Sequence, residues 1–159
     1  MSLTITLPTG AELEALLEQL SGTRCIVAPT SAAPLPSDAF TSVYIDRKGV
    51  PRIVSICDRE LALGLGAALA LMPAVAAREA LESGDLPSGM RDGLRETMNI
   101  SGALLCVEGG PNVRLEALYP SVSEAGERAL AICRDPADRV DYQVQLTGYE
   151  GGGFRFLRA

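Results

Sequence analysis

The residues best suited to chemistry lie on a helix near the middle of the chain, which the hydrophobic periodicity predicts from about Met90 to Val107. At about 100° of rotation per residue, four residues fall within roughly 60° of one another on one side of this helix: Asp92, Glu96, Asn99 and Ala103. Apolar residues fall on the opposite side: Leu94, Met98 and Leu105. A carboxylate and a carboxamide therefore point outward together, either as a working surface or as an ordinary solvated polar face.

The absence of histidine limits the chemistry that this surface can perform. Ser–His and Cys–His nucleophile pairs, His-ligated zinc sites and imidazole acid–base catalysis all require that residue, so they are excluded. The four cysteines form no C-x-x-C pair: Cys25, Cys57, Cys106 and Cys133. We expect them to be reduced, buried thiols rather than a disulfide, a metal site or a reactive site. An enzyme built from this chain must use carboxylates, amides, hydroxyls or the groups of a partner.

The composition indicates one domain, residues 1–159, with a sizeable core, since 47% of the residues are hydrophobic. With 14 basic and 20 acidic residues, a net charge of −6 and no basic cluster, the chain is not expected to bind nucleic acid or an anionic membrane. The N-terminus lacks the features of a signal peptide, and the most apolar run, residues 61–77, contains Pro73 and is too short to span a bilayer. We therefore expect a cytoplasmic protein.

Capping, alternation and turn residues predict the elements of the first half of the chain. These are a helix over 9–20 that begins with a Thr9–Glu12 capping box, a strand over 23–28, a proline-rich loop, and a hairpin of strands 40–45 and 51–57. A helix from Arg59 to Met72 follows, with Asp58 at its N-cap and Pro73 as its stop. Because this helix is apolar nearly all round, we expect it to pack on the sheet and against another helix or a second subunit.

The remaining predicted elements lie before and after the central helix in the sequence. The predicted elements are a short helix over 74–83, a half-buried strand over 113–119 that ends at Pro120, one helix over 124–133, and a terminal hairpin of strands 140–146 and 154–157. The glycine-rich segment 148–153 is interpreted as the hairpin turn, because no helix follows it to form a phosphate-binding loop.

This order of elements resembles the CheC/CheX/FliY family of bacterial chemotaxis phosphatases. The signature of that family is a small or acidic residue, a Glu, an Asn, a Gly shortly afterwards and a Pro some twenty residues later. The matching residues are Asp92, Glu96, Asn99, Gly102 and Pro120. The resemblance covers residues 10–159 and implies an α+β, CheC/CheX-like fold: a mostly antiparallel sheet with two long helices packed side by side on one face.

The resemblance also implies an activity, because members of the family hydrolyse the phospho-aspartate of a CheY-like receiver domain. It implies that Asn99 enters the active site of the receiver and orients the attacking water, while Glu96 engages the phosphate-coordinating lysine of the receiver. An amide both donates and accepts hydrogen bonds, so it can align a water for in-line attack. Asp92 and Ala103 would complete the partner-binding face. The chain would need no metal or cofactor of its own, because Mg²⁺ would be supplied by the receiver.

A single site is expected. Ala62 and Leu65 stand where CheC-type members carry a second Glu and Asn, as in the CheX-type members, which are typically dimeric. The doubly apolar helix and the alternating terminal strands also suggest that a second copy covers some apolar surface or strand edge, which favours a homodimer. The alternative function is a non-catalytic CheC-like binding or scaffolding module in bacterial signalling, which would use the same exposed face.

Overall fold

A computed structural model describes residues 5–105 and 113–159 of the chain. Its centre is a six-stranded antiparallel sheet with the strand order β1-β5-β6-β3-β2-β4. The strands are β1 (Cys25–Pro29), β2 (Phe40–Ile45), β3 (Pro51–Cys57), β4 (Arg114–Tyr119), β5 (Asp138–Leu146) and β6 (Gly152–Arg158). The helices are α1 (Gly10–Ser21), α2 (Arg59–Leu69), α3 (Ala74–Ser83), α4 (Ser88–Ser101) and α5 (Glu127–Arg134), with short 3₁₀ helices η1 (Gly102–Leu105) and η2 (Ser123–Ala125).

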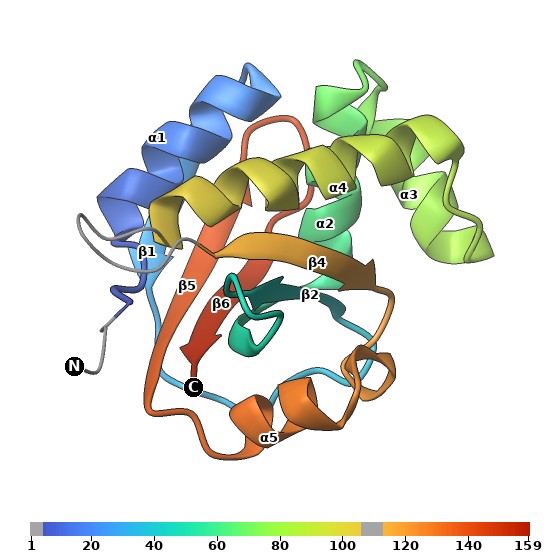
Figure 1. Ribbon diagram of the computed structural model, residues 1–159. Coiled ribbons are helices and arrows are strands. Elements are labelled where there is room, and N and C mark those ends of the chain that lie inside the picture. The colour runs from blue at the N-terminus through green and yellow to red at the C-terminus, as the bar shows by residue number, and fades with distance from the viewer. Residues whose placement is uncertain (1–4, 106–112) are drawn as a thin grey trace.

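The two faces of the sheet carry separate hydrophobic cores. Successive residues of a strand point to opposite faces, so Phe156 joins the core beneath α1, α2 and α4, while Leu157 joins the smaller core beneath α5. Figure 1 shows α1 and α4 on one side of the sheet and α5 on the other. The predicted α+β fold, with an antiparallel sheet and two helices side by side on one face, is confirmed; those two helices are α2 and α4.

The close approach of α2 and α4 depends on one glycine from each helix. A Cβ atom on Gly66 would collide with the carbonyl oxygen of Met90, and a Cβ atom on Gly93 would lie 2.6 Å from the carbonyl oxygen of Gly66. The two backbones therefore touch where the helices cross, and no side chain fits between them. This contact sets the distance between α2 and α4 where they cross.

The buried character of α2 is explained within the chain. Every residue from Leu61 to Ala68 is buried, since α2 is surrounded by the sheet, α3 and α4. The terminal strands β5 and β6 lie in the interior of the sheet order, so neither is an edge. Both features that suggested a second copy are thus satisfied by this chain alone, and the homodimer stays a prediction from the resemblance.

None of the described helices is long and apolar enough to span a membrane.

Three predicted helices end or divide differently in the structure. The helix predicted to reach Met72 ends at Leu69, because Leu71 takes a left-handed conformation with φ of 59°. The central helix changes at Gly102 into the 3₁₀ helix η1, and its predicted end at Val107 lies outside the described residues. The helix predicted over 124–133 is divided into η2 and α5 by Gly126, whose φ is 93°.

Asp58 occupies the predicted N-cap position of α2, but its carboxylate makes no capping hydrogen bond. It accepts a hydrogen bond from the Gly153 N–H at 2.7 Å and pairs with the Arg155 guanidinium at 2.9 Å. Arg155 also approaches Asp141, which pairs with Arg139 at 2.7 Å. The hydrogen bond and the ion pair with β6, rather than helix capping, therefore determine where the Asp58 carboxylate lies.

Candidate partner-binding site

The helix that carries the candidate residues is fixed to the sheet by its apolar side. Met90, Leu94 and Met98 are completely buried. At the C-terminal end of α4, the hydroxyl of the buried Tyr44 donates a 2.7 Å hydrogen bond to the carbonyl oxygen of Met98. Burial raises the pKa of Tyr44, so this hydroxyl keeps its proton and remains a donor at neutral pH. Together with the glycine crossing, this bond leaves α4 little freedom to move relative to β2.

Gly102, the glycine of the family signature, has a structural role here. A Cβ atom at this position would lie 3.3 Å from the ring carbon Cε1 of Tyr44, so the backbone passes directly over the tyrosine ring. At the same point the Gly102 N–H bonds to the Asn99 carbonyl, which tightens the α-helix into η1. Pro120, the last residue of the signature, is exposed and directly follows β4, where it ends the strand as predicted.

The four candidate residues are all exposed: Asp92, Glu96, Asn99 and Ala103. Within the described part of the chain, the side chains of Asp92, Glu96 and Asn99 take part in no hydrogen bond or ion pair. Glu96 and Asn99 are three positions apart on a regular helix, which places their Cβ atoms about 5–6 Å apart on one face. Among the described residues, the structure therefore presents an unpaired carboxylate and an unpaired carboxamide side by side on one helix.

The two hydroxyl groups of α4 nearest to Glu96 and Asn99 are not available to this surface, and the third, on the exposed Ser88, lies about 12 Å along the helix from Glu96. Thr97 and Ser101 are buried, and each donates to the backbone carbonyl one turn earlier, Thr97 to Gly93 at 2.9 Å and Ser101 to Thr97 at 2.7 Å. Of the described cysteines, Cys25 and Cys57 are buried free thiols, as predicted, whereas Cys133 is free but only partly buried because it lies on α5, which covers the smaller core; burial raises the pKa of all three. Cys106 lies outside the described residues. Neither a hydroxyl nor a thiolate nucleophile therefore accompanies Glu96 and Asn99 among these groups.

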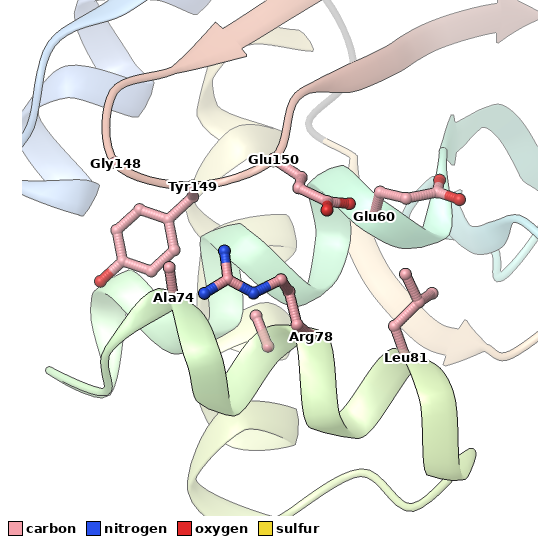
Figure 2. Close-up of a pocket in the computed structure, with 8 residues that line it drawn as sticks. Glu60, Ala74, Arg78, Leu81, Gly148, Tyr149 and Glu150 are labelled. Carbon is pink, nitrogen blue, oxygen red and sulfur yellow. The ribbon is translucent and has the colours of Figure 1, made fainter.

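A cavity of about 280 Å³ lies elsewhere, between α2, α3 and the turn that joins β5 to β6 (Figure 2). Its lining residues are Glu60, Ala74, Ala77, Arg78, Leu81, Gly148, Tyr149 and Glu150. The Tyr149 hydroxyl donates to the Met72 carbonyl at 2.7 Å and ties the turn to the end of α2. None of the candidate residues lines this cavity, and sequence patterns did not predict it, because it requires α3 to lie beside a turn more than sixty positions away.

The four candidate residues form one surface, called the α4 face: Asp92, Glu96, Asn99 and Ala103. They all come from α4 and its 3₁₀ extension η1, and the cavity lies at a different part of the molecule. The described residues contain no group of three or more His, Cys, Asp or Glu side chains arranged to hold a metal ion.

Comparison with known proteins gives no match to a protein-family model and no significant sequence match to a curated protein. Solved structures do match. The FliM middle domain from H. pylori has a TM-score of 0.67 at 10% identity, over 94% of this chain and 84% of that one. FliY from Thermotoga maritima has a TM-score of 0.58 at 9% identity, over 92% and 82%. A chain of the H. pylori FliG–FliM complex has a TM-score of 0.55 at 10% identity, over 94% and 85%.

Identities of about one residue in ten establish the fold and nothing finer. The chain therefore has the fold of the FliM middle domain and FliY, which confirms, at the level of the fold, the predicted resemblance to the CheC/CheX/FliY family.

Proposed function

We propose that this protein is a response-regulator-directed phosphatase that hydrolyses the phospho-aspartate of a CheY-like receiver domain. The observation that carries the proposal is the pair formed by Glu96 and Asn99. Both side chains are exposed, unpartnered within the described residues, and adjacent on a helix held by buried contacts. This is the arrangement that a protein needs if its catalytic groups must enter the active site of another protein.

In the proposed reaction, the Asn99 carboxamide accepts a hydrogen bond from a water molecule and holds it in line with the aspartyl oxygen–phosphorus bond. Attack by the water oxygen breaks that bond, releases inorganic phosphate and returns the aspartate to its carboxylate form. The Mg²⁺ that neutralises the phosphoryl oxygens belongs to the receiver. Asn99 therefore contributes position rather than proton transfer, and positioning of a nucleophile alone can lower a barrier by several kcal/mol.

Glu96 has a different role in this proposal. Its carboxylate pairs with a lysine of the receiver and fixes the angle at which α4 approaches, with Asp92 and Ala103 completing the contact surface. The rigidity of α4 supports this division of roles. The Tyr44–Met98 hydrogen bond and the Gly66–Gly93 crossing hold the backbone beneath both side chains, so their positions depend on rotamers alone.

A non-catalytic binding module is the second candidate, and the fold comparisons favour it specifically. The solved structures that resemble this chain include chains of a FliG–FliM complex and of a FliM–SpeE complex, so proteins with this fold occur in complexes with other proteins. The module would use the same α4 face, and the two candidates differ only in whether phosphate is released.

The experiment that separates them measures phosphate release from phosphorylated receiver domains of the same genome, with and without the purified protein. We expect at least one receiver to lose phosphate faster with the native protein. Arg91→Ala is the matched control, because Arg91 is exposed on α4 but points about 80° away from Asn99 and about 140° away from Glu96 around the helix. Binding of a receiver without faster release would support the module, and a native protein that accelerates none of them would refute the phosphatase.

The proposed partner suggests where the protein acts, and the family resemblance suggests how it assembles. Receiver domains act in the cytoplasm, so we propose that this protein is cytoplasmic too. The homodimer expected from the resemblance is tested by light scattering at micromolar concentration, where a mass near 33 kDa, twice the 16.7 kDa of one chain, is predicted and a single-chain mass would contradict it.

A further inference from the structure

The corner between α2 and α3 exposes a large apolar side chain on a strained backbone. Leu71 is 93% exposed, and it is the one non-glycine residue with positive φ in the described part of the chain. Val75, in the first turn of α3, is 47% exposed. Bulky residues rarely adopt the left-handed conformation, because Cβ then approaches the following carbonyl oxygen.

The local backbone explains why Leu71 is left-handed. The Met72 N–H donates to the Ala67 carbonyl at 2.8 Å, and the Leu71 N–H donates to the Ala68 carbonyl at 3.2 Å. This pair of bonds is the Schellman motif, in which the position held by Leu71 is normally glycine. A leucine at this position lowers the stability of the fold in two ways: its backbone is strained, and its apolar side chain stays exposed to water. Among the residues that the structure describes, no packing contact compensates for these two costs.

This corner adjoins the proposed catalytic face. Gly89, Asp92 and Glu96 have the i, i+3, i+7 spacing of one row on α4. A Cβ atom on Gly89 would lie 3.4 Å from the Met72 methyl carbon, so the row begins beside the residue that follows Leu71. From Gly89 to Asn99 the helix advances about 15 Å. A protein interface of standard size, about 800 Å² on each partner, is roughly 30 Å across and spans both features.

We propose that Leu71 is the apolar anchor with which this protein docks its receiver partner, with Val75 extending the contact. The inference rests on the proposed function. The α4 face is made of charged and polar side chains, whereas most of the binding energy of a protein interface comes from a few buried apolar or aromatic anchors. Leu71 supplies that anchor, and the receiver is expected to present an apolar hollow about 15 Å from its phospho-aspartate.

Leu71→Gly tests the proposal because its two effects have opposite signs. Release of the strain is expected to raise the Tm by about 2–4 °C. Loss of the anchor is expected to raise KM for the phosphorylated receiver about tenfold or more, with kcat unchanged. Leu71→Met keeps both the strain and an apolar side chain, so it should retain the native KM. A purely structural role for Leu71 would not produce higher stability together with weaker docking.

The outcomes separate this inference from the proposed function. If the native protein dephosphorylates a receiver and Leu71→Gly leaves KM unchanged, the anchor is refuted and the phosphatase stands. If the native protein neither binds nor dephosphorylates any receiver, the proposed function is refuted, and the docking of a receiver at Leu71 is refuted with it.

Discussion

Replacement of Gly93 by alanine tests the architecture that holds the α4 face in place. In an isolated helix, Gly→Ala stabilises by about 1 kcal/mol, so sequence alone predicts a more stable protein. In the structure, the new Cβ atom would lie 2.6 Å from the Gly66 carbonyl oxygen and 3.4 Å from the Gly66 Cα. A comfortable carbon–oxygen separation is about 3.3–3.6 Å, so the helices must move apart by roughly 0.7–1.0 Å.

The expected loss of stability depends on which atoms collide. The Gly66 carbonyl oxygen belongs to the backbone, and the position of the new Cβ atom is fixed by the backbone of α4, so no side chain can rotate away. Overpacking that forces a backbone shift costs about 1–3 kcal/mol, and the upper end applies here. After the gain in helix propensity, we expect a net loss of about 2 kcal/mol in the free energy of unfolding, or about 4–8 °C in Tm.

Urea unfolding of the native protein, Gly93→Ala and Gly89→Ala measures this effect. Gly89 is on the same helix, but its new Cβ atom would meet only the flexible end of Met72 at 3.4 Å. Gly89→Ala should therefore be neutral or stabilising by up to about 1 kcal/mol. A Gly93→Ala protein as stable as the native one would refute backbone contact between α2 and α4.

Two further predictions concern hydrogen bonds that hold neighbouring elements. Tyr44→Phe leaves the Met98 carbonyl without its 2.7 Å donor, so we expect urea unfolding at pH 7 to show a loss of about 1–3 kcal/mol. Because burial raises the pKa of Tyr44, its stabilising contribution is complete below about pH 10 and is lost above it, and Tyr44→Phe should show a smaller alkaline fall in stability. Asp46→Asn should lower the Tm, because the carboxylate accepts hydrogen bonds from the Val50 N–H, the Arg52 guanidinium and the Lys48 N–H, which lower its pKa. That contribution is present above about pH 4 and is lost as the pH falls further, so the Tm of the native and Asp46→Asn proteins should converge in acid.

Elements with local determinants could be predicted from sequence. The capping box forms as expected, with the Thr9 side chain accepting from the Glu12 N–H at 3.2 Å, because both partners lie within one turn. The β2–β3 hairpin also forms, since Gly49 supplies the positive φ that its turn requires. The exposure of Glu96 and Asn99 followed from helical periodicity in the same way.

Features that depend on distant partners could not be predicted. Gly93 is an unfavourable helix residue until Gly66, twenty-seven positions earlier, is seen against it. Asp58 has the sequence context of a helix cap, but Arg155 from the last strand draws its carboxylate away. The left-handed conformation of Leu71 cannot be predicted from the sequence, because the Schellman motif that it completes normally contains glycine and Pro73 predicts a later end of the helix.

The most direct test of the central claim is the effect of Asn99→Ala on kcat for dephosphorylation of the receiver, measured with saturating phosphorylated receiver and compared with Arg91→Ala. If Asn99 positions the attacking water, kcat should fall about 10²–10³-fold while the Kd for the receiver stays within about threefold of native. An unchanged kcat in Asn99→Ala would contradict the assignment of the α4 face as the catalytic surface.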